Sequence, residues 1–176
     1  MAGSDHFYGR KNPGITVKFY VCLHLQEIFW KKEREDENMS ETSVNQRKVA
    51  MIGCGFVGSA TAFALMESGL FSEMVLIDAD KNRAEGEALD ISHGLPFARP
   101  MKIYAGDYDD IVDAAIIIVT AGANQKPDET RLDLVQKNVG IFKSIIPEIA
   151  KRNCGGILLI VSNPVDILTY TALKLS

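Results

Sequence analysis

The chain has 176 residues, 47% of them apolar, and a formal net charge of −4. This length suits about one domain with a buried core. The negative charge and the lack of a basic cluster argue against nucleic acid as a partner. Three widely spaced cysteines predict free thiols in a reducing compartment, with neither a disulfide framework nor a metal site. The longest apolar stretch, residues 15–30, is too short and too polar to cross a bilayer. We therefore expect a cytoplasmic protein without membrane contact.

The first 38 residues differ in composition from the rest of the chain. They end in a charge run over residues 31–38, which is typical of solvated segments. Upstream of that run, apolar residues alternate with mostly polar ones over residues 15–25, as in a half-buried strand. One interpretation is a docking arm for a partner subunit. The one we favour is an appended leader, disordered or non-native, with Met39 as the natural start. The sequence thus predicts an extension over residues 1–38 and one domain over residues 39–176.

Strand and helix patterns alternate from residue 47 onward. Short apolar runs predict strands over residues 48–52, 74–77, 102–105, 115–119 and 156–161. Segments rich in Ala and Leu, or with apolar residues at helical spacing, predict helices over residues 56–68, 82–92 and 132–149. Gly69 marks the end of the first helix, and Pro147 is expected to kink or break the last one. The alternation predicts an α/β fold, a Rossmann-type doubly wound parallel sheet that stops after the fifth strand and the helix that follows it.

The turn between the first strand and the first helix carries the motif Gly53-Cys54-Gly55-Phe56-Val57-Gly58. In such a motif the first glycine permits a tight turn, and the second lets backbone N–H groups approach a pyrophosphate. The third lets the helix pack closely on the strand. The amino terminus of the helix then faces the phosphates with its partial positive charge. We interpret Cys54 as a small residue that fits this crowded turn rather than as a redox switch.

A carboxylate, Asp78, follows the second strand, twenty residues after Gly58. It can accept hydrogen bonds from both hydroxyls of an adenosine ribose and would repel a 2′-phosphate, which favours NAD over NADP. We predict that this half of the NAD site consists of Gly53, Gly55, Phe56, Val57, Gly58 and Asp78. Two alternatives stay open: an ordinary glycine turn beside a surface aspartate, and an enzyme that uses S-adenosylmethionine, since such enzymes have a related turn and acid.

Four further segments follow in order: DISHG at residues 90–94, TAGANQKP at 120–127, ETRLDLV at 129–135 and VSNPVD at 161–166. Together they closely resemble the L-lactate dehydrogenases of the lactate/malate dehydrogenase family. The resemblance runs from about Arg47 to Ser176 and does not cover residues 1–38. It implies an NAD-dependent oxidoreductase that transfers a hydride between NAD and a small 2-hydroxy acid. It also implies that His93 is a structural residue and not a general acid.

The resemblance assigns roles to individual residues by position. The pyrophosphate and nicotinamide side of the cofactor is lined by Thr120, Ala121, Gly122 and Ala123. Arg131 resembles the catalytic mobile-loop arginine that polarises the substrate ketone and stabilises the developing oxyanion. Asn163 resembles the asparagine that hydrogen-bonds the substrate and helps to place the nicotinamide, and the bond before Pro164 is expected to be cis. From the residues alone, Arg131 also suits a solvated neighbour of a helix cap at Thr130, and Asn163 a turn residue before proline.

Gln125 occupies the position that separates lactate from malate enzymes in this family. A malate enzyme places an arginine there against the second carboxylate of oxaloacetate, whereas a neutral glutamine suits the methyl group of pyruvate. A second carboxylate buried without a partner costs on the order of several kcal/mol. The resemblance thus implies pyruvate and L-lactate as substrates. With Lys126 as a substitute cation, malate dehydrogenase is the first alternative, and another 2-hydroxy-acid dehydrogenase is the second. The alternative of a different class is a non-catalytic NAD-binding module.

The family's proton donor is a histidine in a Gly-Glu-His-Gly segment, paired with an aspartate and helped by a second arginine. The histidines of this chain, His6, His24 and His93, do not lie in such a segment, and no substrate domain is expected before the last residue, Ser176. Loss of a general acid slows turnover by about 10²- to 10⁴-fold. We therefore expect the chain to be the N-terminal portion of a dehydrogenase and inactive alone. For the full-length family member the resemblance implies a homotetramer.

Overall fold

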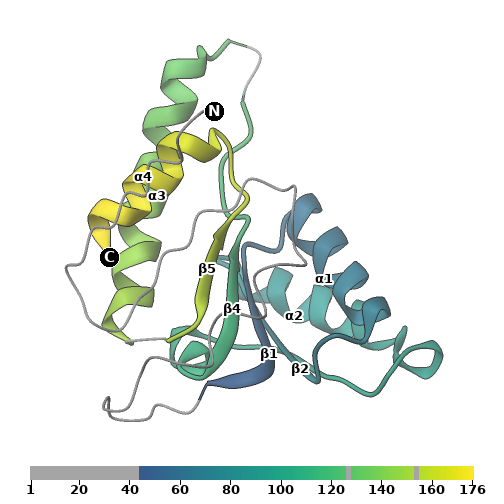
Figure 1. Cartoon of the computed structure of the whole chain (residues 1–176). Coiled ribbons are helices and arrows are strands. Elements are labelled where there is room, and N and C mark those ends of the chain that lie inside the picture. Colours follow the sequence, from purple (N-terminus) through teal and green to yellow (C-terminus); the bar gives the residue numbers. More distant parts are fainter. Residues whose placement is uncertain (1–43, 126–127, 153–154) are drawn as a thin grey trace, which may run out of the picture.

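The computed structural model describes residues 44–125, 128–152 and 155–176, so the expectations for residues 1–38 lie outside its described part. Strands and helices alternate along these residues (Figure 1). The strands are β1 (Asn45–Ile52), β2 (Glu73–Ile77), β3 (Lys102–Ala105), β4 (Ala114–Val119) and β5 (Ile157–Ile160). The helices are α1 (Phe56–Ser68), α2 (Lys81–Ser92), α3 (Arg131–Lys151) and α4 (Val165–Leu175), with the 3-10 helices η1 (Leu95–Phe97) and η2 (Tyr108–Ile111). None of the helices in these ranges combines the length and the apolar character that a membrane span needs.

The five strands form one parallel sheet in the order β3-β2-β1-β4-β5. β1 lies in the centre, where Val49 pairs with Met74 of β2 on one side and with Ile116 of β4 on the other. The chain runs outward from β1 through β2 to β3, and then returns to build β4 and β5 on the opposite side. The strand order therefore reverses between β1 and β4, which is the point where open α/β sheets bind their ligands. The predicted doubly wound, Rossmann-type sheet is confirmed.

Helices cover both faces of the sheet, with α1 and α2 on one face and α3 and α4 on the other (Figure 1). Alternate residues of β1 point to opposite faces. Val49 and Met51 pack in the cluster with α1 and α2, whereas Ala50 and Ile52 pack in the cluster with α3 and α4. All four side chains are at most 2% exposed. This two-sided burial explains why the strands are continuous apolar runs in the sequence.

Local sequence sets several of the helix ends. Gly69 ends α1 as predicted, in the left-handed conformation with a φ of 63°. Asp80 caps α2 by accepting a hydrogen bond from the backbone N–H of Arg83. The sequence predicts a kink or a break of α3 at Pro147. The break does not occur: α3 continues past Pro147 to Lys151. The residues on either side of this proline, at positions 146 and 149, are buried in the core, and their packing keeps the last turn in place despite the missing N–H.

A polar cluster lies at the amino-terminal end of the sheet. The Lys48 side chain is only 8% exposed, and its Nζ lies 2.7 Å from Oδ1 of Asp113 and 3.4 Å from Oε1 of Glu73. The Tyr104 hydroxyl donates a hydrogen bond to the same Glu73 oxygen at 2.9 Å. Burial acts to raise the pKa of Glu73, but the hydrogen bond from Tyr104 and the charge of Lys48 outweigh it and lower that pKa below its ordinary value. The cluster therefore links β1, β2 and β3 to the start of β4.

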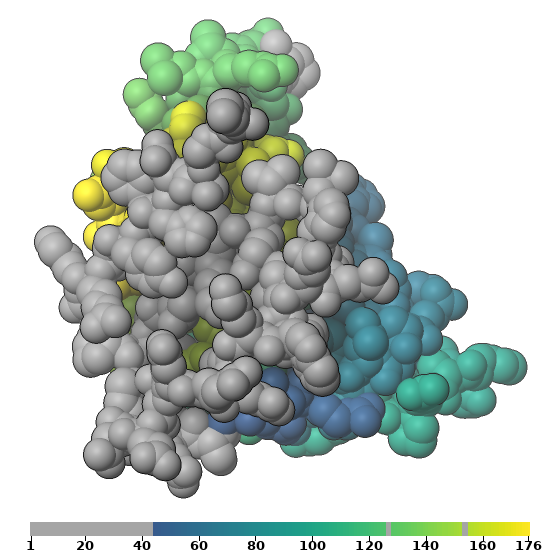
Figure 2. Space-filling model, viewed as in Figure 1, coloured from purple at the N-terminus to yellow at the C-terminus, as the bar shows by residue number. Residues whose placement is uncertain are grey.

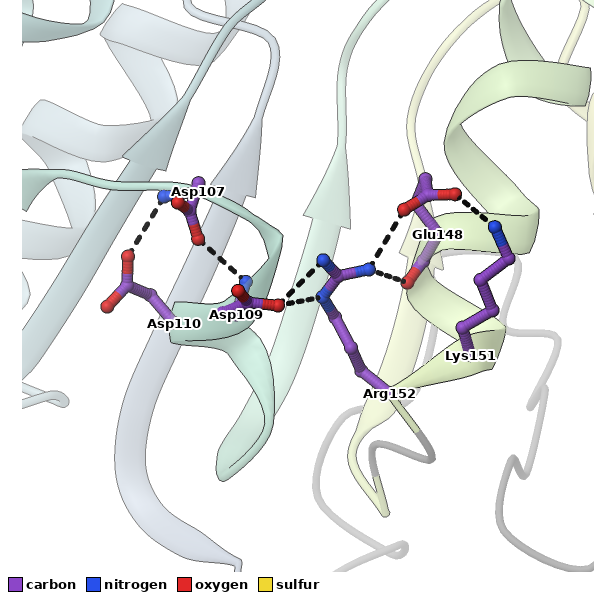
Figure 3. Close-up of polar contacts among 6 residues, drawn as sticks. All are labelled: Asp107, Asp109, Asp110, Glu148, Lys151 and Arg152. Atoms are coloured by element: carbon purple, nitrogen blue, oxygen red, sulfur yellow. Dashed lines mark hydrogen bonds and ion pairs between the residues drawn. The ribbon is translucent and has the colours of Figure 1, made fainter.

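A second polar network fastens the carboxyl-terminal end of α3 (Figure 3). Arg152 donates through Nε to Oδ1 of Asp109 at 2.9 Å and through Nη1 to the backbone carbonyl of Glu148 at 2.9 Å. Glu148 also forms an ion pair with Lys151 at 2.6 Å. Because Asp109 belongs to η2, these contacts tie the last turn of α3 to η2. The first turns of α3, at the other end, project beyond the edge of the sheet (Figures 1 and 2).

Candidate functional site

The loops that follow β1, β2, β4 and β5 meet at the carboxyl edge of the sheet, because all the strands are parallel. Backbone hydrogen bonds hold these loops against neighbouring strands. The N–H of Gly53 donates to the carbonyl of Ile77 at 2.8 Å, and the N–H of Thr120 donates to the carbonyl of Ile52 at 2.9 Å. The predicted cofactor residues that follow β1, β2, β4 and β5 are thus brought to one fixed edge, at the point where the strand order reverses.

The three glycines of the loop after β1 have different surroundings. Gly53 has a φ of 101°, and a Cβ there would lie 2.5 Å from the backbone nitrogen of Ala121. A Cβ on Gly58 would overlap the carbonyl oxygen of Gly53 and would lie 2.8 Å from the hydroxyl oxygen of Thr120. At Gly55, by contrast, a Cβ would have no atom of the described residues within 4 Å apart from those of its two chain neighbours. Two glycines therefore close the turn against the protein, and the middle one faces open space.

Gly55 is also the N-cap residue of α1, a helix of 13 residues that has no side-chain cap. Phe56 and Val57, the first two residues of that helix, are 94% and 56% exposed. The first N–H groups of a helix have no partner within it, and together with the helix dipole they favour an anion. An open glycine at an uncapped helix start is therefore the arrangement that a pyrophosphate fits.

The Asp78 carboxylate lies beside this loop because both of its oxygens accept backbone hydrogen bonds. The N–H of Cys54 donates to Oδ2 at 2.7 Å, and the N–H of Asp80 donates to Oδ1 at 2.9 Å. An ionised carboxylate has about four lone-pair sites, so each oxygen keeps acceptor capacity for a ligand hydroxyl. The side chain is half-buried, which leaves one part of it open to a ligand.

Cys54 lies inside the turn and is 1% exposed. Its thiol donates a weak hydrogen bond to the carbonyl of Ile77, with 3.7 Å between sulfur and oxygen. Burial and the neighbouring charge of Asp78 raise the pKa of the Cys54 thiol to about 12. A thiol in this state stays protonated and is a poor nucleophile. The structure therefore agrees with the interpretation of Cys54 as a small residue in a crowded turn, and not with a redox switch.

The loop after β4 is tied to both neighbouring loops. The Thr120 hydroxyl donates to the carbonyl of Gly53 at 2.7 Å. On the other side, the Ser162 hydroxyl donates to the carbonyl of Ala121 at 2.6 Å. The peptide bond between Asn163 and Pro164 is cis, as the sequence resemblance implies. The loops after β1, β4 and β5 therefore form one connected unit.

Asn138 of α3 adds a further link between the loops after β4 and β5. Both polar atoms of its side-chain amide form hydrogen bonds: Oδ1 accepts from the N–H of Ala123 at 2.8 Å, and Nδ2 donates to the carbonyl of Asn163 at 2.8 Å. The residue is 2% exposed. A Cβ on Gly122 would touch the same amide at 3.5 Å, an ordinary contact. Asn138 thus contacts residues predicted to form the nicotinamide side of the site.

Of the three residues predicted to bind substrate, Gln125 and Arg131 lie between β4 and the first turn of α3, whereas Asn163 follows β5. Gln125 donates through Nε2 to the backbone carbonyl of Glu129 at 2.8 Å. Thr130 caps α3 in a reciprocal capping box with Asp133, which confirms the capping pattern read in the sequence. Arg131 is the first helical residue and is exposed. The cap therefore accounts for Thr130, while a catalytic role for Arg131 stays a prediction.

A family model described as lactate/malate dehydrogenase, NAD binding domain, matches residues 47–176. The chain belongs to the lactate/malate dehydrogenase family. The match covers every residue predicted for the site, and it identifies this part of the family protein as the domain that binds NAD. In this family, therefore, the glycine turn and the carboxylate of Asp78 are parts of an NAD-binding domain and not of an S-adenosylmethionine enzyme.

Known proteins of the lactate/malate dehydrogenase family resemble the chain over the same region. L-lactate dehydrogenase 1 of Clostridium acetobutylicum is 59% identical over 129 residues, which are 73% of this chain and 41% of the relative. L-lactate dehydrogenase of Thermoanaerobacterium saccharolyticum is 60% identical over 129 residues, which are 73% of this chain and 42% of the relative. The chain therefore spans about two fifths of the length of these relatives.

Solved structures of the family have the same fold. A lactate dehydrogenase from a Medee basin deep-sea metagenome library is similar with a TM-score of 0.71 and 48% identity, over 74% of this chain and 42% of that one. The minor L-lactate dehydrogenase of Enterococcus mundtii, in a ligand-bound form, is similar with a TM-score of 0.72 and 44% identity over the same shares.

Sequence reasoning missed Asn138, although a signal for it was present. The residue lies four positions before Phe142 on the buried face of α3, which continues through Ile145 and Ile149. A single polar side chain on an apolar helix face must find hydrogen-bond partners where the helix packs. The sequence thus indicated a buried polar contact in this family member, but not which loops it joins.

Proposed function

We propose that the chain binds NAD along the carboxyl edge of its sheet. The observation that carries this proposal is the open position at Gly55, between two glycines whose Cβ positions are blocked by the protein. Gly55 and the first turn of α1 would hold the pyrophosphate, and Asp78 would hold the hydroxyls of the adenosine ribose. Because β4 and β5 follow β1 in the sheet order, the nicotinamide half falls to Thr120, Ala121, Gly122, Ala123 and Asn163.

We further propose that the protein containing this domain is an L-lactate dehydrogenase that interconverts pyruvate and L-lactate. NAD, when bound, accepts or supplies the hydride. The Arg131 guanidinium would stabilise the negative charge that develops on the keto oxygen, and Asn163 would donate a hydrogen bond to the substrate. Gln125 is neutral and therefore suits a methyl group better than a second carboxylate. None of the sequence's histidines occupies the family's proton-donor segment. We therefore propose that residues 1–176 alone do not catalyse the reaction.

The finer statements on location and assembly rest on the resemblance. We propose a cytoplasmic protein and a homotetramer, with pyruvate and lactate as small-molecule partners and neither nucleic acid nor membrane. Malate dehydrogenase is the first alternative activity. A non-catalytic NAD-binding module is the alternative of another class, and it shares the Gly55 and Asp78 geometry with the main proposal.

Cofactor binding is tested by titrating the 176-residue chain with NADH and NADPH and following the fluorescence of the dihydronicotinamide. NADH should bind more tightly than NADPH. The substitution Asp78→Ala should weaken the binding of NADH and reduce the difference between the dissociation constants of the two nucleotides. Asp90→Ala, at an exposed position of α2, is the matched control. A folded chain that binds neither nucleotide would refute the proposal.

Substrate choice is tested in a chimera that joins this chain to the remaining portion of the Clostridium acetobutylicum relative. Pyruvate should be reduced faster than oxaloacetate, and Gln125→Arg should shift the preference toward oxaloacetate by at least about tenfold. Fast oxaloacetate reduction by the unmodified chimera would favour the malate alternative. NADH binding without turnover of either acid would favour the binding module.

A further inference from the structure

We propose that Asn138 is a positioning residue for the nicotinamide end of the NAD site, where it holds the loops after β4 and β5 in register with each other. This inference rests on the proposed NAD binding. Its basis is that one buried amide joins the Ala123 N–H to the Asn163 carbonyl, with both distances at 2.8 Å. Asn138 would not touch the cofactor itself but would act through those two residues.

The loops after β4 and β5 leave the sheet before they reach Ala123 and Asn163, and the Ser162 hydroxyl joins them only at the carbonyl of Ala121, at 2.6 Å. The last paired positions of β4 and β5 are Val119 and Ile160. The backbone bonds between the two segments then end where the N–H of Ser162 reaches the carbonyl of Val119 at 3.3 Å. Ala123 and Asn163 both lie beyond this point. Among the described residues, the hydrogen bonds that connect these two are those of the Asn138 side chain.

The chemistry of the link requires an asparagine. One partner is a donor and the other an acceptor, so the side chain must supply one acceptor and one donor on the same terminal carbon. An aspartate keeps the acceptor for the Ala123 N–H but sets a second oxygen against the Asn163 carbonyl. A leucine of similar size leaves both backbone groups unpaired, and water does not replace the lost bonds easily because Asn138 is 2% exposed.

The position of the link assigns it to one half of the cofactor. Asp78 and Gly55, which would hold the adenosine ribose and the pyrophosphate, follow β2 and β1. In the order β2-β1-β4-β5, the loops that Asn138 joins lie on the other side of the switch point. A dinucleotide that spans the edge therefore has its nicotinamide half over these loops. Loss of the link should disturb that half and leave the adenosine half in place.

The experiment compares NADH with ADP-ribose, which has the adenosine half, the pyrophosphate and the second ribose but no nicotinamide. The dissociation constants of both ligands are measured for the 176-residue chain and for its Asn138→Asp and Asn138→Leu variants. Asn82→Asp and Asn82→Leu, at an exposed position of α2, are the matched controls. We expect the Kd of NADH to rise about tenfold in both Asn138 variants, because one or two buried hydrogen bonds are lost. The Kd of ADP-ribose should change less than about twofold. Equal weakening of both ligands would mean a purely structural role and would overturn the inference, as would no change in either.

A second measurement uses the unsubstituted chain and so does not depend on how the variants fold. Amide hydrogen exchange at Ala123 should slow more when NADH is bound than when ADP-ribose is bound, because ADP-ribose lacks the nicotinamide that would lie over the linked loops. Equal protection by the two ligands, or none by either, would overturn the positioning role. If the unsubstituted chain binds neither ligand, the proposed NAD binding itself fails, and this result is distinct from NADH binding without the predicted difference.

Discussion

Alanine at Gly55 and alanine at Gly58 should have opposite consequences, although the two glycines belong to the same turn. A Cβ on Gly58 overlaps the backbone carbonyl of Gly53 and lies 2.8 Å from the Thr120 hydroxyl oxygen. Backbone cannot give way as a flexible side chain can, so α1 must shift away from β1. A Cβ on Gly55 has no atom of the described residues within 4 Å apart from those of its two chain neighbours. The backbone there is extended, with φ −75° and ψ −173°, which alanine adopts without strain.

The magnitudes follow from these surroundings. Overpacking against backbone should cost Gly58→Ala about 3 kcal/mol of the free energy of unfolding. For a domain of this size that corresponds to a loss of about 10 °C in Tm. Gly55→Ala should change the free energy of unfolding by less than about 0.5 kcal/mol. Its methyl group, however, would occupy the space in which a pyrophosphate approaches the N–H groups of α1. The loss of a charge-assisted hydrogen bond there, about 1.5–3 kcal/mol, should raise the Kd of NADH about 10- to 100-fold.

Urea unfolding followed by circular dichroism and titration with NADH separate the two effects. The expected result is a stable Gly55→Ala variant with weak NADH binding and an unstable Gly58→Ala variant. The reasoning would be refuted if Gly55→Ala bound NADH with unchanged affinity, because the open position would then not be the phosphate site. It would also be refuted if Gly58→Ala were as stable as the unsubstituted chain.

Three further predictions concern the buried polar groups. Lys48→Met should lower the free energy of unfolding by about 2 kcal/mol, which is less than the roughly 3–5 kcal/mol of a fully buried ion pair because water reaches part of both Glu73 and Asp113. The Kd of NADH should stay unchanged, and urea unfolding and NADH titration check both expectations. Because the pKa of Glu73 is lowered on folding, the stability that its ionised form contributes is present above its ordinary pKa and is lost as pH falls through the lowered value. The destabilisation caused by Glu73→Gln should therefore be constant from pH 7 to about pH 5 and shrink below about pH 4.5, and a constant difference down to pH 3.5 would contradict the assignment. Cys54 should resist iodoacetamide in the folded chain at pH 8 and react after unfolding in urea, as peptide mapping would show; rapid labelling of the folded chain would contradict a pKa of about 12.

Local signals predicted the parts of the structure that depend on local geometry. The predicted start and end of α1 and of β3 agree with the structure, since a glycine stop and a short apolar run are properties of neighbouring residues. The glycine turn and Asp78 occupy the carboxyl edge because each directly follows a parallel strand. Long-range contacts explain the differences. β1 begins three residues before its predicted start because polar Asn45 pairs with the loop before β4, through a 2.8 Å bond to the carbonyl of Asp113.

The candidate site could be predicted only in part for the same reason. The sequence placed Ala123 and Asn163 in separate loops, and their connection through Asn138 depends on how α3 packs against the sheet. Pro147 is a further case. Its missing N–H predicts disruption of the helix, but the apolar face around it lies in the core, and the packing of a long helix outweighs one lost hydrogen bond. The residues of α3 alone predict neither where this helix packs on the sheet nor how much that packing stabilises it.

The anchoring of α3 by Arg152 at one end has a consequence for how the protein can change. The glycines that shape the cofactor turn are locked by backbone neighbours, so almost any substitution at Gly53 or Gly58 damages the fold. Gln125 and Arg131, by contrast, are exposed beside the projecting first turn of a helix whose other end is fixed. Substitutions there leave the core untouched. If Gln125 and Arg131 bind the substrate as proposed, substitutions that alter substrate preference can arise there in single mutational steps without disturbing the glycine turn that would hold the cofactor.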